Sequence, residues 1–152
     1  KNNTTMNLAE AYSTLPELLE YYENELLAIP GILTMKGKTL EVCLKEQTGW
    51  PATYGQHLAT LKTLQQYVDM KTATVRSSLT RQYTEMYNPK LSERQAEKYI
   101  DGEVAFLQAA ELGLLVGEMV MKYQAVMDAF TTRGYALRNI SETRIAGVKS
   151  YE

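Results

Sequence analysis

A long run of apolar residues at helical spacing dominates the middle of the chain. Between Ala52 and Tyr87, apolar or tolerated residues recur every three or four positions, which is typical of a helix that buries one stripe in a coiled-coil-like pairing. Asn88-Pro89 ends the pattern. A helix of this length is a rod of roughly 54 Å, whereas a compact globule of this chain length has a diameter of roughly 40 Å. The pattern therefore predicts an elongated protomer, or one that lends apolar surface to other subunits.

Capping and turn signals divide the N-terminal part into shorter helices. Thr14-Leu-Pro-Glu17 is a capping-box pattern that predicts a helix over 14–28, which Pro30-Gly31 ends. Thr39 is expected to cap a second, short helix that extends to about Gln47. Gly49-Trp50-Pro51 is expected to break that helix before the long one begins.

The C-terminal part shows one short and one long helical pattern. Ser92-Glu-Arg-Gln95 is another capping box, and it predicts a helix that extends to about Ile100. Asp101 is a candidate cap for a last long helix over 103–132, which Gly134 stops before a short segment over 135–145. This long helix is apolar on most of its circumference, and one small protomer can hardly bury all of it. We therefore expect homo-oligomerisation, with contacts that include Leu112, Leu115 and Met119.

Two glycines on that apolar helix have the spacing GxxxG. Gly113 and Gly117 are expected to allow another helix to approach closely. A dedicated dimer motif is one form of such packing, and an ordinary core contact with bulky neighbours is the other. The fold class predicted from these patterns is all-α, with long helices packed coiled-coil-like in an elongated protomer that assembles into a homo-oligomer.

Composition bounds the class of protein. The chain has 152 residues, of which 45% are hydrophobic and 22% charged, so it is one folded domain rather than a disordered chain. Cys43 and His57 are its single cysteine and histidine, which excludes an internal disulfide and argues against a zinc site. Cys43 is expected in the core and His57 on a helix surface. No P-loop, GxGxxG, HExxH or GxSxG motif occurs, so we expect no enzyme, catalytic residue, metal or cofactor.

The expected cellular location depends on whether the chain has a signal peptide or a membrane-spanning segment. Residues 1–10 have no apolar core of a signal peptide. The apolar run 104–121 is interrupted by Gln108, Glu111 and Glu118, so we expect it not to span a membrane. A reducing cytoplasm is the expected compartment.

Charge is distributed unevenly around a net value of −2. Residues 1–35 hold one lysine against five glutamates, and 91–121 hold two basic residues against six acidic ones. Residues 62–90 and 122–149 each hold five basic residues against two acidic ones. In the first basic block, Lys71, Arg76, Arg81 and Lys90 alternate with hydroxyl residues and flank tyrosines such as Tyr83. Basic groups bind phosphates and aromatic rings stack on unpaired bases, which suits single-stranded nucleic acid. A solvated helix face with core tyrosines is the other interpretation.

Several stretches together resemble the UvsY family of bacteriophage recombination mediators. The best runs Val126-Met-Asp-Ala-Phe130-Thr-Thr-Arg133-Gly-Tyr135-Ala-Leu-Arg138-Asn-Ile140, followed by Arg144. Weaker similarity is carried by Lys38-Thr-Leu-Glu41, Glu46-Gln47, Trp50, Tyr54, Arg81-Gln-Tyr-Thr-Glu-Met-Tyr87-Asn, Leu91-Ser-Glu-Arg and Lys98-Tyr-Ile-Asp101. The resemblance covers about 36–146. It divides the chain into an acidic N-terminal arm or helix (1–35), a UvsY-like helical domain (36–146) and a C-terminal tail (147–152).

The resemblance implies a non-enzymatic, all-helical protein that forms a ring-like homo-oligomer, a hexamer or heptamer, on single-stranded DNA. Such mediators help a RecA-like recombinase to displace single-strand-binding protein during phage recombination, repair and replication, in the cytoplasm of the infected bacterial host. The family's basic pair upstream of a tyrosine has its nearest equivalents in Arg76 and Arg81, ahead of Tyr83. The second basic block adds Arg133, Arg138 and Arg144 as expected DNA-binding residues. The family's C-terminal segment is implicated in assembly, which adds subunit contacts at Val126, Phe130, Tyr135, Leu137 and Ile140.

A second class of function competes with this one. The acidic arm, the negative net charge and the coiled-coil-like stripe are also typical of a helical structural or adaptor protein that assembles without nucleic acid. The arm carries a further hypothesis of its own. Its negative charge could cover the basic blocks as a DNA mimic does, in which case deleting residues 1–35 raises DNA affinity at low salt.

Overall fold

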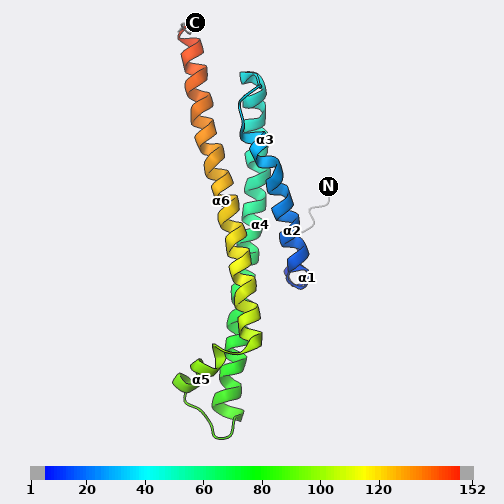
Figure 1. The fold of residues 1–152 in the computed structure, drawn as a ribbon, viewed down its shortest axis with the longest axis vertical. Helices are drawn as coiled ribbons and strands as arrows, with labels where there is room; N and C mark the ends of the chain where they lie inside the picture. Colours follow the sequence, from blue (N-terminus) through cyan, green and yellow to red (C-terminus); the bar gives the residue numbers. More distant parts are fainter. Residues whose placement is uncertain (1–5, 148–152) are drawn as a thin grey trace.

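Two long antiparallel helices form the frame of the protein. The structure is a computed structural model that describes residues 6–147. Helix α4 (Leu40–Arg81) and helix α6 (Val104–Ile145) each contain 42 residues and lie side by side as a hairpin (Figure 1). A helix of that length is about 63 Å long. The expected all-α fold with long packed helices is therefore confirmed, and the protomer is elongated.

Apolar residues spaced three and four apart hold the hairpin together. On α4 the buried line consists of Tyr54, Leu58, Leu61, Leu64 and Val68, which is the middle of the predicted stripe. On α6 it consists of Ala109, Val116, Met119, Tyr123, Val126, Phe130 and Leu137. Because residues at this spacing lie on one face of a helix, each helix presents an apolar face to the other.

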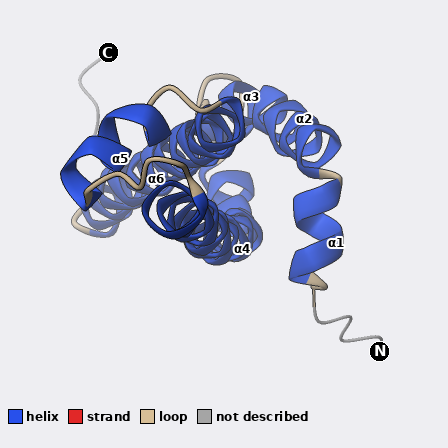
Figure 2. Cartoon of the chain, turned by 90° about the horizontal axis from the view of Figure 1, so that it is seen from below, coloured by secondary structure: helices blue, strands red, loops and turns tan. Residues whose placement is uncertain are grey.

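The N-terminal residues form a third layer on the hairpin. Helix α1 (Leu8–Ser13), helix α2 (Leu15–Glu25), the 3-10 turn η1 (Leu26–Ala28) and helix α3 (Ile29–Leu33) follow one another on one side of the hairpin (Figure 2). Their apolar residues, among them Leu15, Leu19 and Tyr22, belong to the same core as those of α4 and α6. The acidic segment is thus part of one core, and the boundary at residue 35 marks a change in charge rather than in packing.

Local signals gave the wrong details at the start of this layer. Thr14 precedes α2 as expected, but its hydroxyl donates to the Glu10 carbonyl at 3.1 Å instead of capping α2. The helical path also continues past Pro30, which occupies the first turn of α3, where a missing N–H is tolerated.

The predicted break at Gly49-Trp50-Pro51 is wrong, because α4 runs through it without interruption. A proline inside a helix removes one hydrogen bond and costs about 3 kcal/mol. Buried residues lie on both sides of Pro51 along the helix, with Cys43 before it and Tyr54 after it. The Tyr54 hydroxyl also donates to the Glu25 carbonyl at 2.9 Å. Tertiary packing therefore maintains the helix against the local preference.

The predicted stop at Gly134 is also wrong, since α6 continues to Ile145. A Cβ atom added at Gly134 would lie 3.1 Å from Nε2 of Gln47, so this glycine allows α4 to approach closely. Gly113 and Gly117 serve the same contact, because added Cβ atoms there would lie 3.7 Å from Val68 and 3.2 Å from Gln65. The GxxxG spacing thus serves close packing inside the hairpin.

The connection between the long helices folds into a compact end, the hairpin tip (residues 82–103). The π-helical turn η2 (Gln82–Met86) follows α4, and helix α5 (Glu93–Ile100) precedes α6. The predicted capping box is present: the Ser92 hydroxyl accepts from the Gln95 N–H, and the Gln95 side chain accepts from the Ser92 N–H. Asp101 does not cap α6, because Glu103 occupies that position. Of the C-terminal tail, all but Gly147 lies outside the described residues.

Helix α6 is long and apolar enough to cross a membrane by length and composition alone. The apolar helix of a soluble protein passes the same test. Only 22% of its most apolar window is buried within the protomer, so much of this apolar surface faces outward.

Candidate nucleic-acid interface

Three tyrosines gather at the hairpin tip. The Tyr83 ring stacks on that of Tyr99, with centroids 5.5 Å apart and planes at 28°, and its centroid lies 5.5 Å from that of Tyr87. The Tyr83 hydroxyl donates to the Glu103 carboxylate, and this hydrogen bond is the main cause that raises the pKa of Tyr83. Tyr87 and Tyr99 are 45% and 55% exposed. The tip therefore exposes two aromatic rings to solvent, and both pack against Tyr83, whose hydroxyl is held by Glu103.

The sequence pattern points to Tyr83, followed by Tyr87 as the second tyrosine of the basic block, but it gives no sign of Tyr99. Tyr99 reaches the cluster only because α5 folds back beside the end of α4, and a sequence pattern gives no such long-range placement. The signals that could have found it are the capping box at Ser92 and the position of Tyr99 in the last turn of the short helix.

The basic residues of the first block have different environments. Arg76 is half-exposed, lies 4.3 Å from the centroid of the Phe106 ring and pairs with Asp101 at 3.3 Å. Lys71 lies over the Tyr67 ring at 5.4 Å. Arg81 is exposed, pairs loosely with Glu85 at 3.6 Å, and borders a hollow of about 820 Å³ that ends at Met86 and Tyr87. Lys90 is exposed in the loop before α5. Arg81 and Lys90 are thus the residues of this block most available to a phosphate near the tyrosines.

Folding also places acidic residues beside this basic block. The segment 69–103, which contains the end of α4, the tip and α5, has six basic and six acidic side chains. The positive balance of 62–90 is therefore offset by α5 and its flanks, as the Arg76–Asp101 pair illustrates.

The second basic block lies at the other end of the molecule. Arg138 is exposed and pairs with Glu142 at 3.0 Å, and Arg144 is exposed in the last turn of α6. Phe106, which contacts Arg76, and Arg138 are separated by about 48 Å along α6. Within one protomer the structure therefore does not bring the two basic blocks together.

The expectation that Arg133 binds DNA is wrong, because its side chain is only 3% exposed. Its guanidinium donates to Oε1 of Glu46 at 3.0 Å, to Oε1 of Gln47 at 3.2 Å and to the carbonyl of Leu33 at 3.1 Å. Burial and these partners leave no free donor face for a phosphate. Arg133 instead ties α6 to α4 and α3.

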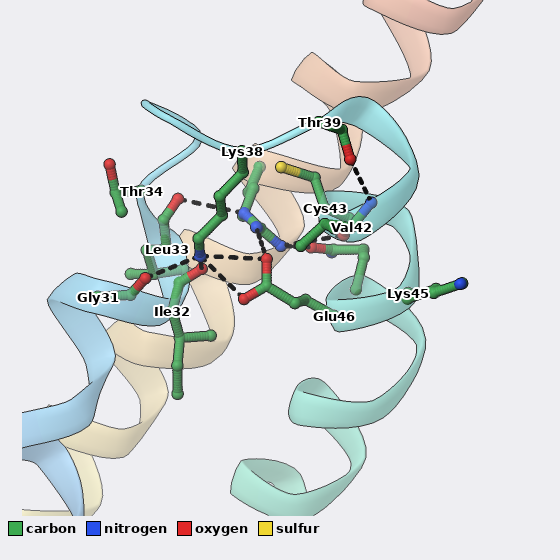
Figure 3. A network of polar contacts seen from close by, with 12 residues as sticks. Gly31, Ile32, Leu33, Thr34, Lys38, Thr39, Val42, Cys43, Lys45 and Glu46 are labelled. Atoms are coloured by element: carbon green, nitrogen blue, oxygen red, sulfur yellow. Dashed lines mark hydrogen bonds and ion pairs between the residues drawn. The ribbon is translucent and has the colours of Figure 1, made fainter.

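A lysine completes this buried network (Figure 3). Nζ of Lys38 donates to Glu46 at 2.9 Å and to the carbonyls of Gly31 and Ile32 at 2.8 and 3.2 Å. The hydrogen bond from Lys38 is the main cause that lowers the pKa of the Glu46 carboxyl, and Arg133 contributes in the same direction. The network fastens the C-terminal end of α3 to the start of α4.

Half of the residues expected at subunit contacts are buried inside the protomer. Met119, Val126, Phe130 and Leu137 belong to the line that faces α4 and the N-terminal layer, so they do not reach a neighbouring subunit. Leu112 is partly buried against the same core. Leu115, Tyr135 and Ile140 are exposed and remain available for assembly.

The two residues with catalytic potential lie apart. Cys43 is buried, as expected, and is separated from His57 by about 21 Å along α4. His57 is not a simple surface residue: its ring lies 5.4 to 6.3 Å from those of Tyr21, Tyr22, Tyr54 and Tyr123. Among residues 6–147, no group of three or more His, Cys, Asp or Glu side chains is placed to hold a metal ion.

Comparison with known proteins adds no neighbour to this description. No protein-family model, curated protein or solved structure matches the chain.

Proposed function

We propose that this protein is a recombination mediator that binds single-stranded DNA and helps a RecA-like recombinase to replace single-strand-binding protein. The proposal rests on the resemblance of residues 36–146 to the UvsY family and on the tyrosine cluster at the hairpin tip. Exposed aromatic rings beside cationic side chains are the combination that binds unpaired bases and their phosphates. In this proposal Tyr87 and Tyr99 stack on bases, while Arg81 and Lys90 contact the backbone.

The electrostatic part of the proposal needs more than one protomer. The tip of a single chain holds three basic and five acidic side chains, and the wider segment 69–103 is balanced in charge, so its affinity for phosphates is weak. Repetition of the tip in a homo-oligomer provides avidity along one strand without any new contact. Arg138 and Arg144, at the far end of α6, form a separate and secondary surface.

Anisotropy of a labelled oligonucleotide across a salt series tests the electrostatic contacts. The double variant Arg81→Ala and Lys90→Ala should weaken binding and reduce the salt slope by roughly 1.4 for each engaged protomer, because each single-strand phosphate contact contributes about 0.7. The matched control removes two exposed lysines far from the tip, Lys36→Ala in the loop before α4 and Lys45→Ala near the start of α4, which changes net charge equally. Equal effects of both double variants would show that the tip is not the site.

Tyr87 tests the stacking contact in isolation. Tyr87→Ala should weaken binding about 5- to 150-fold, since one base–aromatic stack is worth about 1–3 kcal/mol. Tyr87→Phe retains the ring and should bind as the unaltered protein does. Normal binding by Tyr87→Ala would remove the tyrosine cluster from the proposal.

The alternative is a helical structural or adaptor protein that assembles without nucleic acid. The excess of acidic over basic side chains at the tip and the outward apolar surface of α6 favour it. Absence of single-strand binding at low salt, with the protein folded and oligomeric, would support this alternative over the mediator.

A further inference from the structure

The outer face of α6 carries apolar side chains that nothing in the protomer covers. Leu107, Leu114 and Met121 are 50%, 75% and 67% exposed, and they repeat every seven residues, so they lie on one face of the helix. Val104 begins the same line. We call residues 104, 107, 111, 114, 118 and 121 the α6 stripe; its two polar members are Glu111 and Glu118. Large exposed apolar side chains aligned on one helix face, with the two glutamates between them, indicate an interaction surface.

The stripe points away from α4. Gly113 and Gly117 of α6 face Val68 and Gln65, and the stripe residues lie about a sixth of a turn (Met121) to nearly a half turn (Val104) around the helix from their mean direction. The N-terminal layer does not cover the stripe either, as the exposure of its members shows.

The outer face of α4 has complementary properties. Beside the hairpin tip it forms the hollow of about 820 Å³, whose walls include the small side chains Ala73, Thr74, Ser77 and Ser78. Further along α4, Met70 is exposed on the same side, and Lys62 is exposed at the edge of this face, about a quarter turn around the helix from Met70. We call this surface the α4 groove face. It offers room for large apolar side chains and a cation, whereas the α6 stripe offers large apolar side chains and two carboxylates.

The α6 stripe and the α4 groove face also lie at the same level along the long axis of the hairpin. Contacts within the protomer set the register, because Phe106 lies at Arg76, Gly113 at Val68 and Gly117 at Gln65. By this register Leu107 lies level with the small side chains at 73–78. Leu114 lies level with Met70 and Gln66, and Glu118 lies close to the level of Lys62.

We infer that a second copy of this chain docks its α6 stripe onto the α4 groove face, in a head-to-tail interface. Copies related by rotation about an axis parallel to the helices stay at one height, so the large side chains meet the hollow and Glu118 meets Lys62. Because the two surfaces lie on opposite sides of the hairpin, each copy uses one surface for each neighbour. Such heterologous contacts generate a ring when the rotation closes.

Pairing of the stripe with itself is disfavoured by charge. In a parallel two-fold dimer, or an antiparallel one centred near Leu114, Glu111 and Glu118 of one copy would face the same carboxylates of the other, and like charges across an interface are costly. The small side chains of α4 would then also remain uncovered.

This inference rests on the self-association included in the proposed function and supplies its surface. In the resulting assembly all hairpin tips lie at one end, which would align the tyrosine clusters along a shared rim. The residues differ from those expected from the C-terminal segment, since three of the latter, Val126, Phe130 and Leu137, are buried within the protomer.

The test is sedimentation velocity of the full chain without DNA, over a range of concentrations. Leu114→Glu damages only the stripe and Ala73→Glu damages only the groove face, and each should lose the oligomer of the unaltered protein. Thr53→Glu, at an exposed α4 site outside both surfaces, is the matched control and should assemble normally. Circular dichroism confirms that all three remain helical.

Mixing the variants separates head-to-tail from two-fold assembly. Leu114→Glu retains its groove face and Ala73→Glu retains its stripe, so an equimolar mixture should form a one-to-one dimer and nothing larger. Assembly lost in Leu114→Glu but retained in Ala73→Glu would overturn the inference in favour of stripe-to-stripe pairing. Retained assembly in both, or a monomeric unaltered protein at all concentrations, would overturn it outright.

A charge exchange tests the register at exposed positions where folding is not at risk. Glu118→Lys should weaken assembly, and adding Lys62→Glu in the same chain should restore it. No restoration would overturn the register. DNA binding is measured separately, so loss of the mediator function with an intact head-to-tail assembly would leave this inference standing.

Discussion

Replacing Arg133 with alanine should destabilise the protein more than replacing any exposed, ion-paired lysine or arginine. The guanidinium is 3% exposed, and its loss removes the ion pair with Glu46 and the donor to the Leu33 carbonyl. Breaking a buried pair by removing one partner costs about 3–5 kcal/mol. Glu46 keeps its pair with Lys38 at 2.9 Å, so we expect the lower end of that range.

Urea unfolding at matched protein concentration measures the effect. A loss of about 3 kcal/mol corresponds to a midpoint lowered by roughly 1–3 M, given a slope of about 1–3 kcal/mol per M for a domain of this size. Arg138→Ala is the matched control, because Arg138 lies on the same helix and also pairs with a glutamate but is exposed. The control should lose less than about 1 kcal/mol. Equal losses of unfolding free energy in the two variants would refute the argument that burial makes the Arg133 interactions more stabilising than those of Arg138.

Three further predictions concern other parts of the core. Because the pKa of Glu46 is lowered in the folded protein, its ionised carboxylate contributes fully to the free energy of unfolding above the ordinary glutamate pKa of about 4.3. This contribution is lost as pH falls through the lowered pKa of the folded state. The difference in stability between the unaltered protein and Glu46→Gln should therefore shrink from pH 5 to pH 3 in urea unfolding. Burial raises the pKa of Tyr123 far above its usual value, so its contribution should fall as pH rises above about 10, and Tyr123→Phe should flatten that alkaline loss in thermal unfolding. Pro51→Ala should raise the free energy of unfolding by about 1–3 kcal/mol, because it restores a helix hydrogen bond, and an unchanged or lower urea midpoint would contradict this.

The sequence patterns predicted what depends on local periodicity and missed what depends on distant partners. The buried stripe of α4 and the capping box at Ser92 are present as expected. Pro51 and Gly134 were interpreted as helix breakers because they are so in isolation, yet packing between α4 and α6 carries the helices through both. The sequence alone does not distinguish a glycine that ends a helix from one, such as Gly134, that allows a neighbouring helix to approach closely.

The candidate site shows the same division. Tyr83, Arg81 and Lys90 were identified from their order in the chain, and all three lie at or beside the tip. The buried role of Arg133 could not be predicted, because Glu46 and Leu33 lie 87 and 100 positions away in sequence. The acidic residues beside the basic end of α4 could not be predicted for a related reason: the chain returns Asp101 and Glu103, which follow α5, to Arg76 and Tyr83, so block sums along the chain do not describe the folded surface.

The N-terminal arm illustrates how packing changes the meaning of a charge pattern. Deleting residues 1–35 would remove Leu15, Leu19 and Tyr22 from the core, so that deletion tests stability rather than autoinhibition. Neutralising Glu17 and Glu20, both exposed, changes the charge and leaves the core intact. The arm reaches α4 at Tyr67, where the Tyr12 ring packs against it, and Arg81 lies about 21 Å further along the helix. That separation exceeds the Debye length of about 8 Å at physiological ionic strength, so Glu17→Gln with Glu20→Gln should leave single-strand affinity unchanged in anisotropy at that salt concentration. An affinity raised several-fold by the double variant would show that the arm does shield the tip.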